Sequence, residues 1–197
     1  LSKGQRISLE KDGGGQLTNM CIGVNWGAIQ KKGFFGGLKM EAVDLDASCV
    51  VFDSNKNILN IVYFGELNAP GISHSGDDLT GDMDGDDGLD NEIISVNLVN
   101  VNSQADQIVF VLNSFQGHDF KDIPFASIRI YEGTPTQVNK IHATFDVANS
   151  SDFGGSVTMI LGKLYKNNGG WKFTAFGDTT SDRGLEPAIQ TVSRSYL

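Results

Sequence analysis

The sequence predicts a mainly all-β protein, a β-sandwich of two antiparallel sheets with a short C-terminal helix. Three observations lead to this fold class: about ten short runs that alternate or are apolar throughout, turn-forming residues between them, and helical spacing confined to the tail. No internal repeat, low-complexity segment or linker divides the chain. We therefore expect a single domain over residues 1–197.

The expected strands follow one another along the whole chain. In order they span 6–10, 20–26, 42–53, 58–64, 93–101, 107–112, 126–132, 141–147, 157–165 and 171–176. Asn and Gly at 167–170 predict a hairpin between the last two, because these residues accept positive φ. Leu185, Ile189 and Val192 recur at helical spacing, which predicts a helix over 185–196.

Composition excludes several partners. The chain has 24 acidic and 15 basic residues and a net charge of −9, which argues against nucleic acid and against an anionic membrane surface. No stretch of about 18 apolar residues exists, so direct membrane insertion is not expected. Cys21 and Cys49 stand in apolar runs and predict buried free thiols. With no signal peptide recognised, these features predict a cytoplasmic location.

One segment, residues 74–92 and here called the acidic loop, carries most of the interpretable chemistry. Between 77 and 92 there are 8 of the 24 acidic residues in 16 positions, and no Lys or Arg occurs from 57 to 120. Carboxylates so crowded repel one another, and a hard divalent cation offsets that repulsion most directly. Glycines recur every three to five residues and allow the backbone to wrap and present carbonyls. The pattern predicts calcium, although a solvated acidic loop is the plainer alternative.

Two known calcium-binding sequence patterns do not fit the acidic loop. An EF-hand that began at Asp82 would need Gly where Asp87 stands and Glu where Ile93 stands. The nonapeptide β-helix pattern needs tandem copies, and the chain has one acidic block. The flanking segments also have the character of strands. Any site here therefore has another architecture.

A second acidic element lies earlier in the chain. In a strand, Asp44, Asp46 and Ser48 would project from one face, with apolar residues on the other. Two carboxylates inside an apolar run are costly unless they are paired. Alone, the element fits a polar outer face equally well. Together with the acidic loop, it predicts one composite metal site.

These elements, in this order, resemble the TerD family of tellurium-resistance proteins, and the resemblance covers nearly the whole chain. The motifs that carry it are Ile22-Gly23-Val24-Asn25-Trp26, Asp44-Leu45-Asp46-Ala47-Ser48, His74-Ser75-Gly76-Asp77-Asp78-Leu79-Thr80-Gly81 followed by Asp84-Gly85-Asp86-Asp87, Phe125-Ala126-Ser127-Ile128-Arg129, and the stretch from Ile160 to Phe173. The opening residues 1–11 are also similar to the family's first strand.

The resemblance implies a calcium-binding β-sandwich that serves bacterial tellurite resistance and stress responses. It implies protein partners in a stress-response complex and one or two Ca²⁺ ions. The ligands it implies are Asp44, Asp46, Asp77, Asp82, Asp84, Asp86, Asp87 and Glu92. The sequence departs from relatives at Gly27, at Asp82, and at 88–91, which looks like an insertion before Glu92.

No enzyme signature is present, and we expect a non-catalytic protein. There is no nucleophile elbow, P-loop or HExxH motif, and the three histidines share no ligand spacing. His74 abuts the acidic loop and could donate a hydrogen bond to a metal ligand, but it is interpreted as a plain surface histidine. The alternative is a metal-dependent hydrolase, phosphoesterase or nuclease-like, that uses the clustered carboxylates. Phe34 and Phe35, between glycines, fit a core cap and an exposed contact point equally well.

Overall fold

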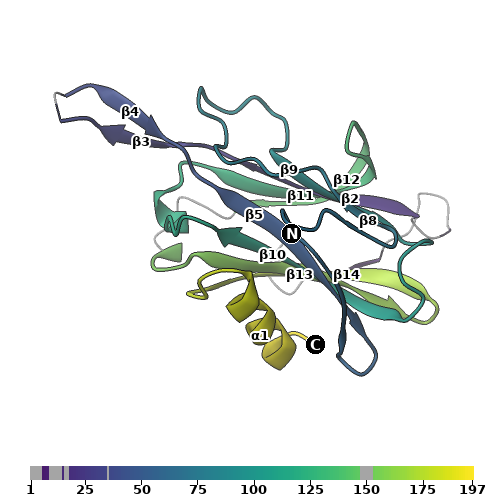
Figure 1. Cartoon of the computed structure of the whole chain (residues 1–197). Coiled ribbons are helices and arrows are strands. Elements are labelled where there is room, and N and C mark those ends of the chain that lie inside the picture. The colour runs from purple at the N-terminus through teal and green to yellow at the C-terminus, as the bar shows by residue number, and fades with distance from the viewer. Residues whose placement is uncertain (1–5, 9–14, 16–17, 35, 147–152) are drawn as a thin grey trace.

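The computed structural model describes residues 6–8, 15, 18–34, 36–146 and 153–197. Two six-stranded antiparallel sheets lie face to face (Figure 1). The first has the order β1 (Arg6–Ser8), β14 (Gly170–Thr180), β13 (Thr158–Asn167), β10 (Ala105–Ser114), β5 (Leu45–Asp53) and β6 (Ile58–Val62). The second has the order β12 (Gln137–Asp146), β11 (Ala126–Thr134), β2 (Asn19–Trp26), β9 (Glu92–Asn97), β8 (Ile72–His74) and β7 (Asn68–Ala69). The mainly β fold class is confirmed.

Alternation along β5 shows how the layers form. Its odd-numbered residues Leu45, Ala47, Cys49 and Val51 belong to the core between the sheets, together with apolar residues of β2 and β9. Its even-numbered residues project from the opposite face, because successive side chains of a strand alternate. That outer face carries a separate apolar cluster, which includes Val50 and Phe52.

The C-terminal helix, α1 (Leu185–Ser195), covers part of this outer face (Figure 1). Its buried residues Ala188 and Val192 pack in one cluster with Val109 and Ile160 of the sheet. The i, i+4 spacing of these helix residues gives α1 one apolar stripe. A helix at the end of the chain, predicted from the sequence, is confirmed within a residue or two of its bounds.

Four strands were not expected from the sequence. β3 (Ile29–Lys32) and β4 (Leu38–Glu41) form a separate hairpin that projects beyond the sandwich (Figure 1). The short strands β8 and β7 add to one edge of the second sheet, next to β9. Phe34, at the tip of the hairpin, is 98% exposed, so it does not cap the core. Phe35 lies outside the described residues.

Several smaller predictions are also settled. Cys21 and Cys49 are buried and free. Within the described residues, no helix is long and apolar enough to cross a membrane. A short 3₁₀-helix, η1 (Phe120–Asp122), lies between β10 and β11. The predicted strands 6–10 and 141–147 run at one end into residues that the structure does not describe.

The edge of β5 is open where the second acidic element lies. β6 pairs with β5 from Cys49 to Phe52, whereas β10 pairs along the other edge as far as Leu45. Among the strands that the structure describes, none pairs with the first half of β5 on that side. The acidic loop, which connects β8 to β9, reaches this open edge through the contacts described next.

Candidate metal centre

The acidic loop is anchored by its backbone at the end of β2. Ala28 donates to the carbonyl of Asp82 (3.1 Å) and Asp82 donates back to the carbonyl of Trp26 (2.9 Å). Val43, just before β5, donates to the carbonyl of Thr80 (3.2 Å). The middle of the loop is thereby held against the end of β2 and beside the start of the second acidic element.

Trp26 forms the base of this arrangement. Its indole Nε1 donates to the carbonyl of Val43 at 2.7 Å, and its backbone N–H donates to Oδ1 of Asn91 at 2.8 Å. Gly81 has φ +64°, and a Cβ there would lie 2.5 Å from the indole. Only glycine allows the loop to pass so close to the ring.

Asp44, Asp46 and Asp77 form the first carboxylate cluster. One oxygen from each lies within 4.8 Å of the others, so the strand element and the acidic loop do meet, as the sequence predicts. Asp44 and Asp46 are only 3% and 6% exposed. Within the described residues, Oδ1 of Asp44 is buried and has no hydrogen-bond partner. A buried acceptor without a donor is costly, and a cation at this point would satisfy it.

In the absence of a cation, burial and neighbouring carboxylates disfavour the charged forms of Asp44 and Asp46. Burial, with the neighbouring charges of Asp77 and Glu92, raises the pKa of Asp44 to about 6. Burial, with the charges of Asp44 and Glu92, raises the pKa of Asp46 to about 7. A bound divalent ion would favour the charged forms and reverse this. The residues of the first cluster therefore fit a cation.

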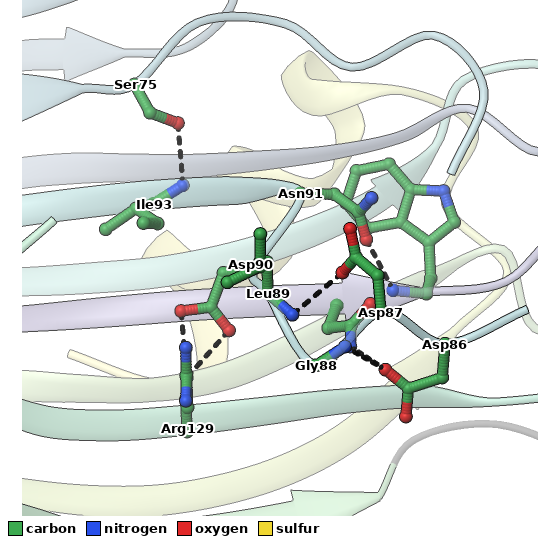
Figure 2. Close-up of polar contacts among 11 residues, drawn as sticks. Ser75, Asp86, Asp87, Gly88, Leu89, Asp90, Asn91, Ile93 and Arg129 are labelled. Carbon is green, nitrogen blue, oxygen red and sulfur yellow. Dashed lines mark hydrogen bonds and ion pairs between the residues drawn. The ribbon is translucent and has the colours of Figure 1, made fainter. Parts of the chain in front are cut away.

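Asp82, Asp86 and Asp87 form a second carboxylate cluster, again with oxygens within 4.8 Å of one another. This cluster is more exposed and its aspartates are held by turns: Gly88 donates to Asp86 and Leu89 donates to Asp87, both at 2.8 Å (Figure 2). The described residues thus offer two candidate cation sites.

His74 is not a surface histidine, and that prediction is wrong. Its side chain is fully buried, with Nε2 at 3.3 Å from Oε2 of Glu92 and 3.0 Å from the carbonyl of Ala47. Oε2 of Glu92 accepts from the N–H of Ala47 (2.8 Å), and Oε1 accepts from Asp78 (3.2 Å). Alternation in β8 placed His74 toward the core, a signal that its acidic neighbours obscured.

Two of the eight predicted ligands lie outside the clusters. Asp84 is exposed in the middle of the acidic loop, and Glu92 is the buried partner of His74. Both oxygens of Glu92 accept hydrogen bonds from the protein itself. Its evident task is to hold the acidic loop to β5. Ligation by either residue stays a prediction.

Asp78 and Asp90 were acids without an assigned role, and the structure gives each one. Asp78 accepts from the N–H groups of Thr80 and Gly81 and from the amide of Asn91. Asp90, which is 3% exposed at its side chain, pairs with Arg129 at 2.8 Å (Figure 2). The four residues 88–91, which look inserted in the sequence, therefore carry anchoring contacts.

A glycine signalled the position of Asp90. A Cβ at Gly23, inside the apolar strand β2, would lie 2.0 Å from a carboxylate oxygen of Asp90. Glycine inside a strand often marks such a close approach. The sequence showed the glycine, but it could not show which group approaches it.

Taken together, the fold and the clusters define an acidic β-sandwich protein with candidate cation sites at one end of its sheets. The chain belongs to the TerD domain family, whose model matches residues 1–191. It is 33% identical over 190 residues to "Tellurium resistance protein TerZ" of Serratia marcescens, covering 94% of this chain and 92% of that protein. It is 35% identical over 202 residues to "Stress response protein SCP2" of Bacillus subtilis (strain 168), covering 96% of each.

A solved structure supports the fold. The crystal structure of a homologue of telluride resistance protein (TerD) from Streptomyces coelicolor A3(2) superposes with a TM-score of 0.66, covering 90% of this chain and 95% of that chain. The two sequences are 13% identical. At that identity the likeness concerns the arrangement of the sheets and not the ligands.

Proposed function

We propose that this protein is a non-catalytic calcium-binding module of a cytoplasmic stress response that includes tellurite resistance. The observation that carries the proposal is the first carboxylate cluster: two buried aspartates lie close to Asp77 of the acidic loop, and one of them has an oxygen without a hydrogen-bond partner among the described residues. The names of the relatives supply the physiological setting. The buried free thiols of Cys21 and Cys49 support a reducing compartment.

The donor set favours calcium over other cations. Calcium takes six to eight oxygen ligands in flexible geometry, from carboxylates and backbone carbonyls. Asp44, Asp46 and Asp77 would hold one ion, and the second cluster, Asp82, Asp86 and Asp87, would hold another. Magnesium demands a tighter octahedron and retains water. Each cluster offers carboxylate oxygens and no sulfur or imidazole, and such a donor set suits a hard ion.

The ion would act by neutralising the acidic loop and ordering its side chains. The backbone of the loop is already held by hydrogen bonds at Trp26 and Val43. The ion would therefore order mainly the carboxylate side chains and not the backbone. The same loop exposes the apolar side chains of Leu79, Met83 and Leu89. We infer that the calcium-loaded loop presents these side chains to a protein partner in a stress-response complex.

A catalytic role has less support. Hydrolases that use clustered carboxylates and metal also place a cation near the transferring group. The acidic loop has no Lys or Arg, and Arg129, which reaches it from β11, is engaged by Asp90. We therefore propose calcium binding as the function. Metal-dependent hydrolysis is the alternative, and tighter binding of Mg²⁺ or Mn²⁺ than of Ca²⁺ would favour it.

Calorimetric titration tests the proposal directly. Chelated protein titrated with CaCl₂ should release heat at one or two sites, and MgCl₂ should bind much more weakly. Asp46→Asn and Asp87→Asn should each remove or weaken a different site. Asp106→Asn, on β10 and outside both clusters, is the control and should bind like the parent. Absence of calcium binding in the parent would refute the proposal.

A further inference from the structure

A pocket of ≈ 450 Å³ opens on the outer face of the first sheet, beside the start of α1. This volume is in the range of small-molecule sites. Asp46, Ser48 and Asn113 from β5 and β10 line its floor. Asp46 and Asn113 are directly paired across the two strands and therefore share a face. Of the residues that line this pocket, only Asp46 belongs to a proposed calcium site.

The floor presents an oriented hydrogen-bond acceptor. Asn113 is 2% exposed, and its Nδ2 donates to Oγ1 of Thr158, which itself donates to the carbonyl of Asp182 (2.8 Å). A carbonyl can only accept, so the hydroxyl must donate to it and accept from the amide. This fixes the amide with Oδ1 free. Among the described residues, neither Oδ1 of Asn113 nor Oγ of the 4% exposed Ser114 has a partner.

The opposite end of the pocket suits an anion. Arg183, Gly184 and Leu185 line it, immediately before and at the first turn of α1. No side chain caps this helix, whose N-terminal end carries partial positive charge. Arg183 forms no ion pair within the described residues. Glu186 opposes this charge from the first turn but does not line the pocket.

Aromatic side chains form the remaining wall. Phe64 and Phe115 meet edge to face with ring centroids 5.6 Å apart, and Tyr63 meets Phe64 in the same manner at 5.2 Å. Phe64 and Phe115 are both exposed, and all three rings line the pocket. Exposed aromatic rings beside a polar floor offer a stacking surface for a planar ligand.

We propose that this pocket binds a small aromatic anion that carries a hydrogen-bond donor at the end opposite its carboxylate or phosphate group. The anionic group lies at Arg183 and the start of α1, the ring lies against Phe64 and Phe115, and the donor meets Oδ1 of Asn113. Asn113 lies on β10 and Arg183 follows β14, which is two strands away in the same sheet, so the strands that carry these two groups are about 10 Å apart. That length accommodates one ring with substituents at opposite ends.

The proposed ligand site is separable from the calcium sites. Arg183, Asn113 and Phe115 belong to neither carboxylate cluster. Asp46 is the one residue that both share. Binding is therefore to be measured in chelator and in calcium, so that failure of one proposal is distinguishable from failure of the other.

The test uses probes that differ by one group. The full-length protein is titrated with 4-hydroxybenzoate and 4-aminophenyl phosphate, while amide chemical shifts of Asn113, Ser114 and Phe115 are followed. Phenol lacks the anion and benzoate lacks the donor. We expect one or both complete probes to shift these amides saturably, at least tenfold more tightly than phenol and more tightly than benzoate. Comparison of 4-hydroxybenzoate with 4-aminophenyl phosphate shows whether the site prefers a carboxylate or a phosphate.

Exposed-residue variants supply the controls. Arg183→Gln should weaken the better probe at least tenfold, and Phe115→Ala should weaken it as well. Arg194→Gln, in the last turn of the same helix, should leave it unchanged. Thermal unfolding checks that each variant is folded. The proposal is overturned if neither complete probe binds in chelator or calcium, if phenol binds equally well, or if Arg183→Gln and Arg194→Gln behave alike.

Discussion

The imidazole of His74 and the carboxylate of Glu92 lie 3.3 Å apart in the interior and both bind the backbone of Ala47, one at its carbonyl and one at its N–H. These side chains come from β8 and β9 of the second sheet, whereas Ala47 belongs to β5 of the first. At the open edge of β5 no strand bonds the N–H and carbonyl of Ala47 among the described residues, and the side chains of Glu92 and His74 bond these two groups instead. The pair thus joins the two sheets at the candidate metal centre.

Loss of the Glu92 charge should destabilise the fold. In the parent, one oxygen of Glu92 accepts from the N–H of Ala47 and the other accepts from the N–H of Asp78. Glu92→Gln replaces one of these oxygens by an NH₂ group, which donates and cannot accept, so one of the two N–H groups loses its partner. We expect a loss of about 2–3 kcal/mol, because a buried donor is left unmatched. Urea unfolding of parent and variant measures it. Glu132→Gln on β11 is the matched control, and equal stability of Glu92→Gln and parent would contradict the role given to Glu92.

Without metal, the protein should lose stability as pH rises from about 5 to 7.5, the interval that contains the raised pKa values of Asp44 and Asp46, about 6 and about 7. In this interval the folded aspartates hold protons that the unfolded chain has released, so rising pH favours unfolding. His74 adds the same sign: burial disfavours its charge, but Glu92, the carbonyl of Ala47 and Asp46 outweigh burial and raise its pKa.

Melting temperatures in chelator across this pH range measure the effect, and saturating calcium should flatten or reverse the slope. A chelated protein that is more stable at pH 7.5 than at pH 5 would contradict the buried, unpaired state of the first carboxylate cluster.

Asp46→Asn should separate charge from packing. The amide resembles the protonated carboxyl in shape, so at pH 7.5 the chelated variant should melt above the chelated parent, by a few degrees for about 1 kcal/mol. It should at the same time gain less from calcium than the parent, because only the second carboxylate cluster stays intact. Scanning calorimetry with and without calcium reads both effects. A variant that melts lower in chelator and gains as much from calcium as the parent would disprove the assignment of Asp46.

The pair of Asp90 and Arg129 should behave as an ion pair whose carboxylate is buried and whose guanidinium is partly exposed. Arg129→Gln leaves the buried carboxylate of Asp90 without its partner, and we expect a loss of about 3 kcal/mol or more. Asp90→Asn combined with Arg129→Gln should recover much of that loss, because no charge then remains unpaired. Denaturant unfolding of the two variants decides this, and a double variant less stable than Arg129→Gln alone would count against it.

Periodicity and turn residues predicted the sandwich well, because its core strands alternate cleanly and one helix closes the chain. The β3–β4 hairpin was missed since its polar strands, such as Ile29–Lys32, carry no apolar pattern. The meeting of Asp44 and Asp46 with Asp77 was predictable from strand alternation and charge crowding. The contact of His74 with Ala47 depends on how the two sheets lie against each other. The partners of Asp90 and Asn113 depend on which strands become neighbours within one sheet. Local sequence encodes neither.

The central claim is that the carboxylate clusters bind calcium in the folded protein. The most direct measurement is the melting temperature of the parent at pH 7.5 in chelator, in calcium and in magnesium. An ion at a hundredfold excess over its Kd contributes about 2.7 kcal/mol, which corresponds to roughly 5–10 °C for a chain of this size. We predict a rise of that order with calcium and a much smaller one with magnesium. Equal melting in chelator and calcium would contradict the account.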